Sequence, residues 1–313
     1  MEQEYKYMVA TRCFTFNHAP YIEDAMNGFA MQETTFPTLF LVIDDSSTDG
    51  EQEILRSWAE NNLSTREGCP LWRRMPYGDV AEGSLSGKSN VTFAILLLAE
   101  NHYKLKKPKL PYLIDWLAVS KYHALCEGDD WWIDSGKLQK QVLFLESHPE
   151  HSLCFCSHQE YYPDGHLAVV KRYENNIEQC PMEDIIAGSG GYMATCSMVF
   201  VGDRAGNYPD WAKGTPIGDL PLMLLLASRG HVGYLSDTMC TYRLSSIGSW
   251  NYRVARSRDL QEKHYKGSIK MWKGFDTWTD HRYHKIVKQV IRSYKKAHLR
   301  LMLLYYIKYQ FKK

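Results

Sequence analysis

Three acidic side chains crowd into residues 127–130, where Glu127, Asp129 and Asp130 are interrupted only by a glycine. The short apolar run 122–126 before them is typical of a strand, and apolar residues recur after them at helical spacing. Carboxylates this close raise each other's pKa unless a cation lies among them. Oxygen ligands suit Mg²⁺ or Mn²⁺, so the pattern predicts a divalent-cation site; an acidic surface turn is the alternative.

Another acidic loop lies earlier in the chain and begins with Asp44 and Asp45, directly after the apolar run 39–43. We call it the first acidic loop, and residues 127–130 the second acidic loop. Ligands of open α/β sheets bind outside the carboxyl ends of strands, so both aspartates are predicted to lie where a small molecule binds. A carboxylate there can accept a hydrogen bond from a pyrimidine N–H or a ribose hydroxyl. The alternative is that one aspartate caps the next helix, for which Thr48 and Glu51 can also form a capping box.

A third candidate is Asp219, which stands before the apolar stretch 220–226. This spacing predicts a helix that begins near Asp219 and ends before Gly230. The positive end of the helix would keep the carboxylate ionised, as a general base requires. An aspartate that caps a helix is also ionised, so the roles of general base and helix N-cap both stay open for Asp219.

The elements that position these residues alternate between strand and helix, which is typical of an α/β fold. Apolar patterns predict strands over 7–16, 39–43, 92–99, 122–126, 152–158, 193–201 and 239–243. Residues 64–90 are rich in Gly, Ser, Pro and Arg and are predicted to form a long loop or an insertion. Within them, Gly83–Ser89 resembles a phosphate loop, but three residues separate its glycines where four are needed, so we reject a nucleotide site there.

Composition excludes several classes of protein. A length of 313 residues allows one large α/β domain or two small ones, and a formal net charge of +1 gives no reason to expect nucleic acid. The eight cysteines form no C-x-x-C pair, which argues against structural zinc and favours free thiols in the cytoplasm. The start of the chain lacks the apolar core of a signal peptide, and no run approaches the ~20 apolar residues of a membrane span.

The C-terminal segment, residues 251–313, differs in character from the rest. After Asp280 no acidic residue occurs, while lysines and arginines alternate with apolar residues at helical spacing. Such a basic amphipathic helix can lie on an anionic membrane, here the inner face of the cell membrane. It can equally dock on its own domain with a solvated basic face.

Over roughly residues 8–250, the chain resembles the family 2 glycosyltransferases of the bacterial kind that decorates surface polysaccharides. The resemblance rests on the order and spacing of several short motifs together. These motifs are Phe14–Ile22 (FTFNHAPYI), Gln32, Val42–Gly50 (VIDDSSTDG), Glu127–Trp132 (EGDDWW), Lys137–Gln141 (KLQKQ), Gly218-Asp219 and Tyr242-Arg243.

The resemblance implies a GT-A fold, a Rossmann-like α/β/α sandwich with a mostly parallel central sheet. This catalytic domain would span residues 1–250, and a basic, largely helical extension would span 251–313. The implied reaction is an inverting transfer, dependent on Mn²⁺ or Mg²⁺, of a sugar from a UDP- or GDP-linked donor. The acceptor would be a glycan or a lipid-linked saccharide in surface polysaccharide biosynthesis.

The resemblance also implies roles for the acidic residues. By position, Asp45 would contact the nucleobase, and Thr15 and Asp44 would line the nucleoside pocket. Asp129 would be the main metal ligand, with Glu127 at the first position of the family's D-x-D motif.

Asp219 would be the catalytic base. One departure is that such enzymes often have a histidine shortly after Tyr-Arg, whereas Leu244-Ser245-Ser246 occupies these positions here. A non-catalytic nucleotide-sugar-binding homologue is therefore an alternative function. A sugar-1-phosphate nucleotidyltransferase is another, but it would need a glycine-rich basic loop after the first strand, and residues 14–20 contain no Gly, Lys or Arg.

Overall fold

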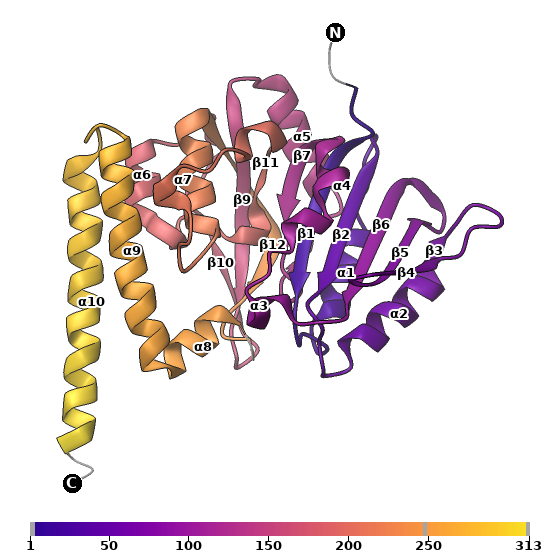
Figure 1. Cartoon of the computed structure of the whole chain (residues 1–313). Helices are drawn as coiled ribbons and strands as arrows, with labels where there is room; N and C mark the ends of the chain where they lie inside the picture. The colour runs from indigo at the N-terminus through magenta and orange to yellow at the C-terminus, as the bar shows by residue number, and fades with distance from the viewer. Residues whose placement is uncertain (1–3, 247–248, 311–313) are drawn as a thin grey trace.

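The computed structural model describes residues 4–246 and 249–310, and Figure 1 shows how their elements are arranged. Its strands are β1 (Tyr7–Thr15), β2 (Thr38–Asp44), β3 (Leu63–Ser64), β4 (Trp72–Met75), β5 (Gly78–Leu85), β6 (Lys88–Leu98), β7 (Ser120–Leu125), β8 (Trp131–Trp132), β9 (His151–Tyr161), β10 (Leu167–Val170), β11 (Val199–Val201) and β12 (His231–Arg243). Its α-helices are α1 (Ile22–Ala30), α2 (Glu51–Asn62), α3 (His102–Leu105), α4 (Ile114–Ala118), α5 (Lys137–Ser147), α6 (Met182–Gly188), α7 (Asp219–Arg229), α8 (Trp250–Arg256), α9 (Arg258–Trp278) and α10 (His284–Gln310). Its 3-10 helices are η1 (Leu110–Tyr112), η2 (Ser189–Gly191), η3 (Thr195–Ser197), η4 (Gly202–Ala205) and η5 (Asp210–Ala212).

The strands form one sheet in the order β3-β5-β6-β2-β1-β7-β11-β9-β12-β8, with β4 paired to β5 and β10 to β9. The central strands β6, β2, β1 and β7 are parallel. β11 is antiparallel to both β7 and β9, and β12 is parallel to β9, so β9 and β12 run in the same direction as the central strands. The carboxyl ends of β6, β2, β1, β7, β9 and β12 therefore lie at one edge of the sheet, and that of β11 lies at the opposite edge. The predicted mostly parallel central sheet is confirmed, with antiparallel hairpins at its flanks.

Helices cover both faces of the sheet (Figure 1). In β2, Phe40 and Val42 face a core that includes side chains of α1, α2 and α5, whereas Leu39 and Leu41 face a core that includes residues 113 and 117, beside α4. Every residue of β2 is buried, which explains why its sequence shows no polar alternation. The sheet thus has the two covered faces of an α/β/α sandwich.

The predicted basic C-terminal segment forms two long helices, α9 and α10, which lie side by side at one end of the molecule (Figure 1, orange and yellow). Met271, Trp272 and Phe275 of α9 and Val287 and Val290 of α10 are buried in one cluster with side chains of α6, α7 and β12. The first half of α10 is therefore docked on the sandwich. None of the helices in the described ranges combines the length and apolar character that crossing a bilayer requires.

The prediction of a long loop over 64–90 is wrong, because these residues form β3, β4, β5 and the start of β6 at the edge of the sheet. The buried positions of β5 include Gly78 and Gly83 as well as Val80, Ala81 and Leu85, so glycines interrupt the apolar alternation that would indicate a strand. A Cβ at Gly78 would lie 2.0 Å from the Leu97 carbonyl oxygen, so close packing against β6 requires glycine there. The rejected phosphate-loop match is the β5–β6 hairpin, which turns at Gly87 with φ of 81°.

The predicted strand over 193–201 is also shorter than expected. Only Val199–Val201 pairs as β11, and Thr195–Ser197 forms η3 instead. The Ser197 hydroxyl donates to the Ala194 carbonyl at 2.6 Å, a local side-chain bond that favours a turn over a strand.

Candidate active site

The carboxyl ends of β1, β2 and β7 bring the two predicted acidic loops together. Thr15, the last residue of β1, is paired in register with Asp44, the last residue of β2. The loop after β7 then crosses β1, where the Gly128 amide donates to the Phe14 carbonyl at 3.2 Å. A Cβ at Gly128 would lie 2.2 Å from the Thr15 hydroxyl oxygen, so this approach requires glycine. Thr15 therefore lies between the acidic loops.

Asp45 is buried, and the chain itself supplies donors to both oxygens of its carboxylate. The amides of His102 and Tyr103 donate to it at 2.7 and 3.1 Å, at the start of α3, and the Lys109 ammonium donates at 2.8 Å. The same lysine carries a charge that lowers the pKa of Glu127. Lys109 thus links the two acidic loops electrostatically, and the nucleobase contact of Asp45 stays a prediction.

Asp44 differs from its neighbour because one of its oxygens has no donor. Its Oδ1 atom accepts a hydrogen bond from the Ser47 amide at 3.0 Å and another from the Gln52 side chain. Its buried Oδ2 atom has no hydrogen-bond partner within the described ranges. Burial raises the pKa of Asp44. A proton, or a donor on a bound molecule, would satisfy this oxygen.

The predicted capping box of Thr48 and Glu51 does not form. Gly50, with φ of 96°, occupies the N-cap position of α2, and the amide of Glu51, the first residue of the helix, donates to Asp49 Oδ1 at 3.2 Å. The Glu51 carboxylate instead turns into the site, where it accepts bonds from the Thr15 hydroxyl, the His18 amide at 2.8 Å and the Ser47 hydroxyl at 2.8 Å. Burial raises its pKa. Glu51 therefore fixes the turn after β1 and the turn after β2 relative to each other.

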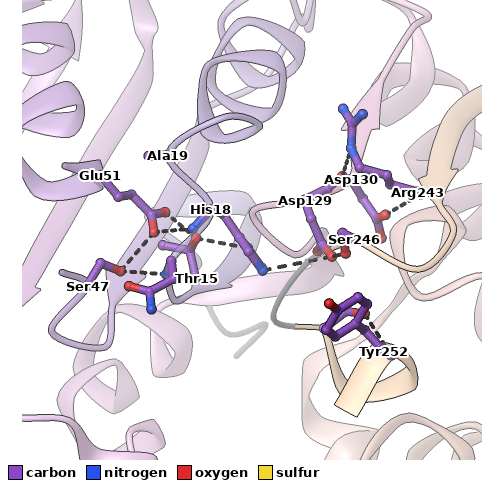
Figure 2. Close-up of polar contacts among 12 residues, drawn as sticks. Thr15, His18, Ala19, Ser47, Glu51, Asp129, Asp130, Arg243, Ser246 and Tyr252 are labelled. Carbon is purple, nitrogen blue, oxygen red and sulfur yellow. Dashed lines mark hydrogen bonds and ion pairs between the residues drawn. The ribbon is translucent and has the colours of Figure 1, made fainter. Parts of the chain in front are cut away.

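His18 joins this group to the second acidic loop, as Figure 2 shows. Its Nδ1 atom lies 3.2 Å from the Thr15 hydroxyl, and its Nε2 atom lies 3.9 Å from Asp129 Oδ2. From the other side, the Ser246 hydroxyl donates to the same Asp129 oxygen. Ser246 belongs to the Leu-Ser-Ser segment where the family often has histidine. An imidazole is thus present beside Asp129, but it comes from the turn after β1.

The second acidic loop keeps its carboxylates close together with few donors. Although Glu127 reaches the surface, its surroundings raise its pKa to about 8, chiefly by desolvation and then by the charge of Asp129. Burial and the Asp129 charge also raise the pKa of Asp130 well above its ordinary value. Glu127 makes no side-chain hydrogen bond within residues 4–246 and 249–310 that would stabilise its charged form. The carboxylates of this loop therefore repel one another when they are ionised, and a bound cation would relieve that repulsion.

Arg243 holds the backbone of this loop in place. Its amide donates to Asp130 Oδ1 at 2.8 Å, and its Nε atom donates to the Asp129 carbonyl at 3.0 Å. The guanidinium also lies 4.5 Å from the centroids of the Trp131 and Tyr21 rings. Arg243, the last residue of β12, therefore fixes the backbone of the second acidic loop.

Asp219 is the first residue of α7 and is half-buried. One carboxylate oxygen accepts from the Leu220 amide at 2.8 Å, and the other lies 3.4 Å from the Thr195 hydroxyl. The charge of Asp219 contributes to the raised pKa values of Glu127 and Tyr242. Asp219 thus shares the electrostatic environment of the acidic loop, and its role as a base stays a prediction.

A hard divalent cation fits the residues at the acidic loop. Mg²⁺ and similar ions are usually held by one or two carboxylates together with substrate phosphates and water. Asp129 and Glu127 supply two carboxylates. Within the described ranges no third His, Cys, Asp or Glu completes a compact ligand set with them. These two residues would hold the ion, and a bound diphosphate would supply further oxygens.

Solved structures of similar fold include TarS of S. aureus, with a TM-score of 0.53 and 14% identity over 84% of this chain and 39% of that chain. TarS in complex with UDP gives a TM-score of 0.51 and 14% identity over 84% of this chain and 64% of that chain. The mannosyltransferase PcManGT from Pyrobaculum calidifontis, in complex with GDP-Man and Mn²⁺, gives 0.51 and 16% over 94% of this chain and 74% of that chain. The predicted GT-A fold is confirmed at this level.

In sequence, the chain is 28% identical over 248 residues to uncharacterised proteins of Mycobacterium bovis and Mycobacterium tuberculosis. The match covers 79% of this chain and 62% of those relatives, so the chain spans about three fifths of their length. No family model matches the chain.

Proposed function

We propose that this chain is an inverting glycosyltransferase that uses a UDP- or GDP-linked sugar and Mn²⁺ or Mg²⁺. The acceptor would be a hydroxyl of a glycan or lipid-linked saccharide, in surface polysaccharide biosynthesis. The observation that supports this proposal best is the meeting of two acidic loops at the carboxyl edge of a GT-A sheet. Lys109 connects Asp45 to Glu127 there, and His18 connects Thr15 to Asp129.

The nucleoside would bind at the ends of β1 and β2. Asp44 Oδ2, which lacks a donor from the described residues, would accept a hydrogen bond from a ribose hydroxyl or a pyrimidine N–H. Thr15 would line the same pocket. Asp45 accepts hydrogen bonds from two backbone amides at the start of α3. It would therefore position this wall of the nucleoside pocket as well as contact the base.

The diphosphate would bind beside Asp129 and Glu127. A divalent ion held there would offset the phosphate charge and stabilise the departing nucleoside diphosphate as a Lewis acid. Two donors of this chain would orient the phosphate oxygens: the His18 imidazole, which lies 3.9 Å from Asp129, and the Lys109 ammonium, whose charge acts on Glu127.

Asp219 would take the proton from the acceptor hydroxyl as that oxygen attacks the anomeric carbon from the face opposite the leaving group. Its position at the positive end of α7 favours the ionised form that a base needs. In-line displacement of this kind inverts the anomeric configuration. A Thr195 hydroxyl at 3.4 Å would help to hold the carboxylate.

A thermal-shift screen of the full chain against UDP, GDP and their sugar conjugates, each with Mn²⁺, tests donor binding. A bound ligand stabilises the fold by mass action, so one base should raise the unfolding temperature in a Mn²⁺-dependent way. Absence of any shift at millimolar nucleotide would contradict the proposal.

Asp219→Asn tests the chemical step. We expect transfer, or sugar-nucleotide hydrolysis in water, to fall by about 10²–10⁴-fold with donor affinity unchanged, which is the range for a general base. Asp210→Asn, at an exposed aspartate that pairs with Lys213, is the matched control. Normal turnover by Asp219→Asn would remove its role as base.

The second candidate is a non-catalytic nucleotide-sugar-binding homologue. The observation that favours it is Ser246, which lies against Asp129 in the segment where the family often has histidine. Donor binding with no hydrolysis of any bound nucleotide sugar, and no transfer to any acceptor, would support this candidate over an active transferase.

We also propose that the end of α10 contacts an anionic membrane on the cytoplasmic side. Leu299 and Leu303 are 67% and 59% exposed, and the basic residues Arg292, Lys296 and Arg300 beside them are also exposed. Co-sedimentation with phosphatidylglycerol vesicles, compared with phosphatidylcholine vesicles, tests this contact. Leu299→Ser with Leu303→Ser should weaken binding and Leu167→Ser, on β10, should not; equal sedimentation with both lipids would contradict it.

A further inference from the structure

A second group of potential metal ligands lies at the opposite edge of the sheet from the acidic loops. There, β9 and β12 begin side by side, with His151 paired in register with His231. The ligand atoms of Glu150, His151 and His231 all lie within 4.8 Å of one another. We propose that these three residues form a binding site for a divalent transition-metal ion of the Zn²⁺ type.

The strongest support is an unpaired nitrogen on a buried imidazole. His151 is 2% exposed, and its Nε2 atom is bonded to the Glu178 carbonyl oxygen. A carbonyl only accepts, so Nε2 carries the proton and Nδ1 of the neutral ring presents a lone pair. This buried Nδ1 has no hydrogen-bond partner among the described residues, yet it lies 3.1 Å from a carboxylate oxygen of Glu150.

Two electron-rich atoms at this distance repel each other unless a positive charge lies between them. A second proton on His151 would give an ion pair, but the contact lacks the directional geometry of a hydrogen bond. Two ligands of one tetrahedral ion, each about 2.1 Å from it, lie roughly 3.4 Å apart. The observed separation of 3.1 Å is short enough for both atoms to bind one ion, so a metal ion can take the place of a proton between them.

The surroundings hold the ligands in position. The Glu178 carbonyl fixes the tautomer of His151, as the partners of metal-bound histidines usually do. The ring is packed against Phe144 and His148, each with a centroid separation of 5.1 Å. The His231 amide donates to the Glu150 carbonyl at 3.2 Å, so the third ligand is tied to the first.

The donor set also separates this site from the acidic loops. Two imidazoles and one carboxylate favour Zn²⁺, Co²⁺ or Ni²⁺, whereas oxygen ligands alone favour Mg²⁺ and Mn²⁺. Glu150 and His231 are exposed, which lets an ion enter and leaves room for a water ligand. A bound ion would join the first residues of two adjacent parallel strands and so stabilise that edge.

Zn²⁺ and Co²⁺ titrations of the chelator-treated full chain, without nucleotide, test this site. We expect Co²⁺ to give the visible absorption of a low-coordinate nitrogen-containing site and Zn²⁺ to raise the unfolding temperature. In Glu150→Gln with His231→Gln, where both residues are exposed and folding is checked by circular dichroism, the Co²⁺ signal should vanish and the Zn²⁺ affinity should fall at least tenfold.

The matched control is His284→Gln, because Asp276, His281 and His284 form another group of close ligand atoms. This control should keep the Co²⁺ absorption and the Zn²⁺-dependent thermal shift. Unchanged Zn²⁺ and Co²⁺ binding in Glu150→Gln with His231→Gln, or loss of binding only in His284→Gln, would overturn the proposal.

Discussion

The two acidic loops look alike in sequence but are opposite in their electrostatics. Asp45 receives two backbone amides and the Lys109 ammonium, so its charge is compensated by the chain. Glu127 and Asp130 instead have pKa values raised by burial and by the charge of Asp129 between them. In the first loop the charge of Asp45 is compensated by the chain, although Asp44 keeps one oxygen without a donor among the described residues, whereas in the second loop a positive ligand would compensate the carboxylates. We therefore propose that the metal binds at Asp129 and that Asp45 forms part of the wall of the nucleoside pocket.

The largest expected effect is that of Asp129→Asn, which removes the main ligand charge of the second loop. We expect Mn²⁺-dependent UDP or GDP affinity to fall by at least about 100-fold, since even outer-shell changes cost 10–100-fold. Isothermal titration with and without Mn²⁺ measures this.

Asp130→Asn is the matched control for that change, because asparagine keeps an acceptor for the Arg243 amide. Its nucleotide affinity should stay within about threefold, well below the loss at a direct ligand. Equal losses in both variants would show that charge in the loop, and not a ligand at Asp129, supports binding.

Next in size is the effect of Asp45→Asn on stability. The amide group would place a donor against backbone N–H groups and leave Lys109 unpaired, so we expect the free energy of unfolding to fall by about 1–3 kcal/mol. Urea unfolding of the metal-free chain measures this, and Asp129→Asn should not lower stability there because it removes repulsion. A larger loss of unfolding free energy in Asp129→Asn than in Asp45→Asn would contradict this account of the two loops.

The pH dependence of Mn²⁺ binding tests whether Glu127 of the second acidic loop binds the metal. With a pKa of about 8, Glu127 is protonated at pH 6, so the ion must displace a proton. Affinity should rise about tenfold per pH unit up to about pH 8 and then level off. Glu127→Gln should flatten this slope, and an unchanged slope would exclude Glu127 as the titrating group.

The raised pKa of Glu127 also determines the direction in which the stability of the metal-free protein changes with pH. The folded chain holds the Glu127 proton more tightly than the unfolded chain, whose ordinary value is 4.5. The metal-free protein should therefore lose stability as pH rises from about 4.5 to about 8, and Glu127→Gln should remove this part of the loss.

The smallest effect is expected for His18→Asn. The ring touches Thr15 and lies 3.9 Å from Asp129, so it contributes one hydrogen bond and one electrostatic contact. We expect Mn²⁺-nucleotide affinity to fall about fivefold, equivalent to roughly 1 kcal/mol. Titration beside His166→Asn, an exposed histidine on the β9–β10 hairpin, provides the comparison. A loss as large as that of Asp129→Asn would make His18 a principal ligand.

Sequence patterns predicted the buried strands and the helices that follow them, because apolar runs and helical spacing are local signals. They also predicted that Asp44 and Asp129 follow strands and that Asp219 begins a helix. They did not predict the role of Glu51, because a Thr-x-x-Glu spacing fits a capping box equally well and its real partner, Thr15, is 36 residues away. Lys109 was missed for the same reason, since Asp45 is 64 residues distant.

Glycines prevented the prediction of strand β5. In β5, inward positions such as Gly78 present no side chain, so the strand was predicted as a loop. The hydrogen bond from Ser246 to Asp129 was not predicted, because a serine in a loop is usually only a turn residue.

A crystal structure with Mn²⁺ and the preferred nucleoside diphosphate, collected at the manganese absorption edge, tests the central claim most directly. The account predicts one anomalous peak about 2.1 Å from an Asp129 carboxylate oxygen, with phosphate oxygens completing its shell and the nucleoside against Asp44. A manganese peak away from Asp129, or a nucleotide bound away from both acidic loops, would contradict it.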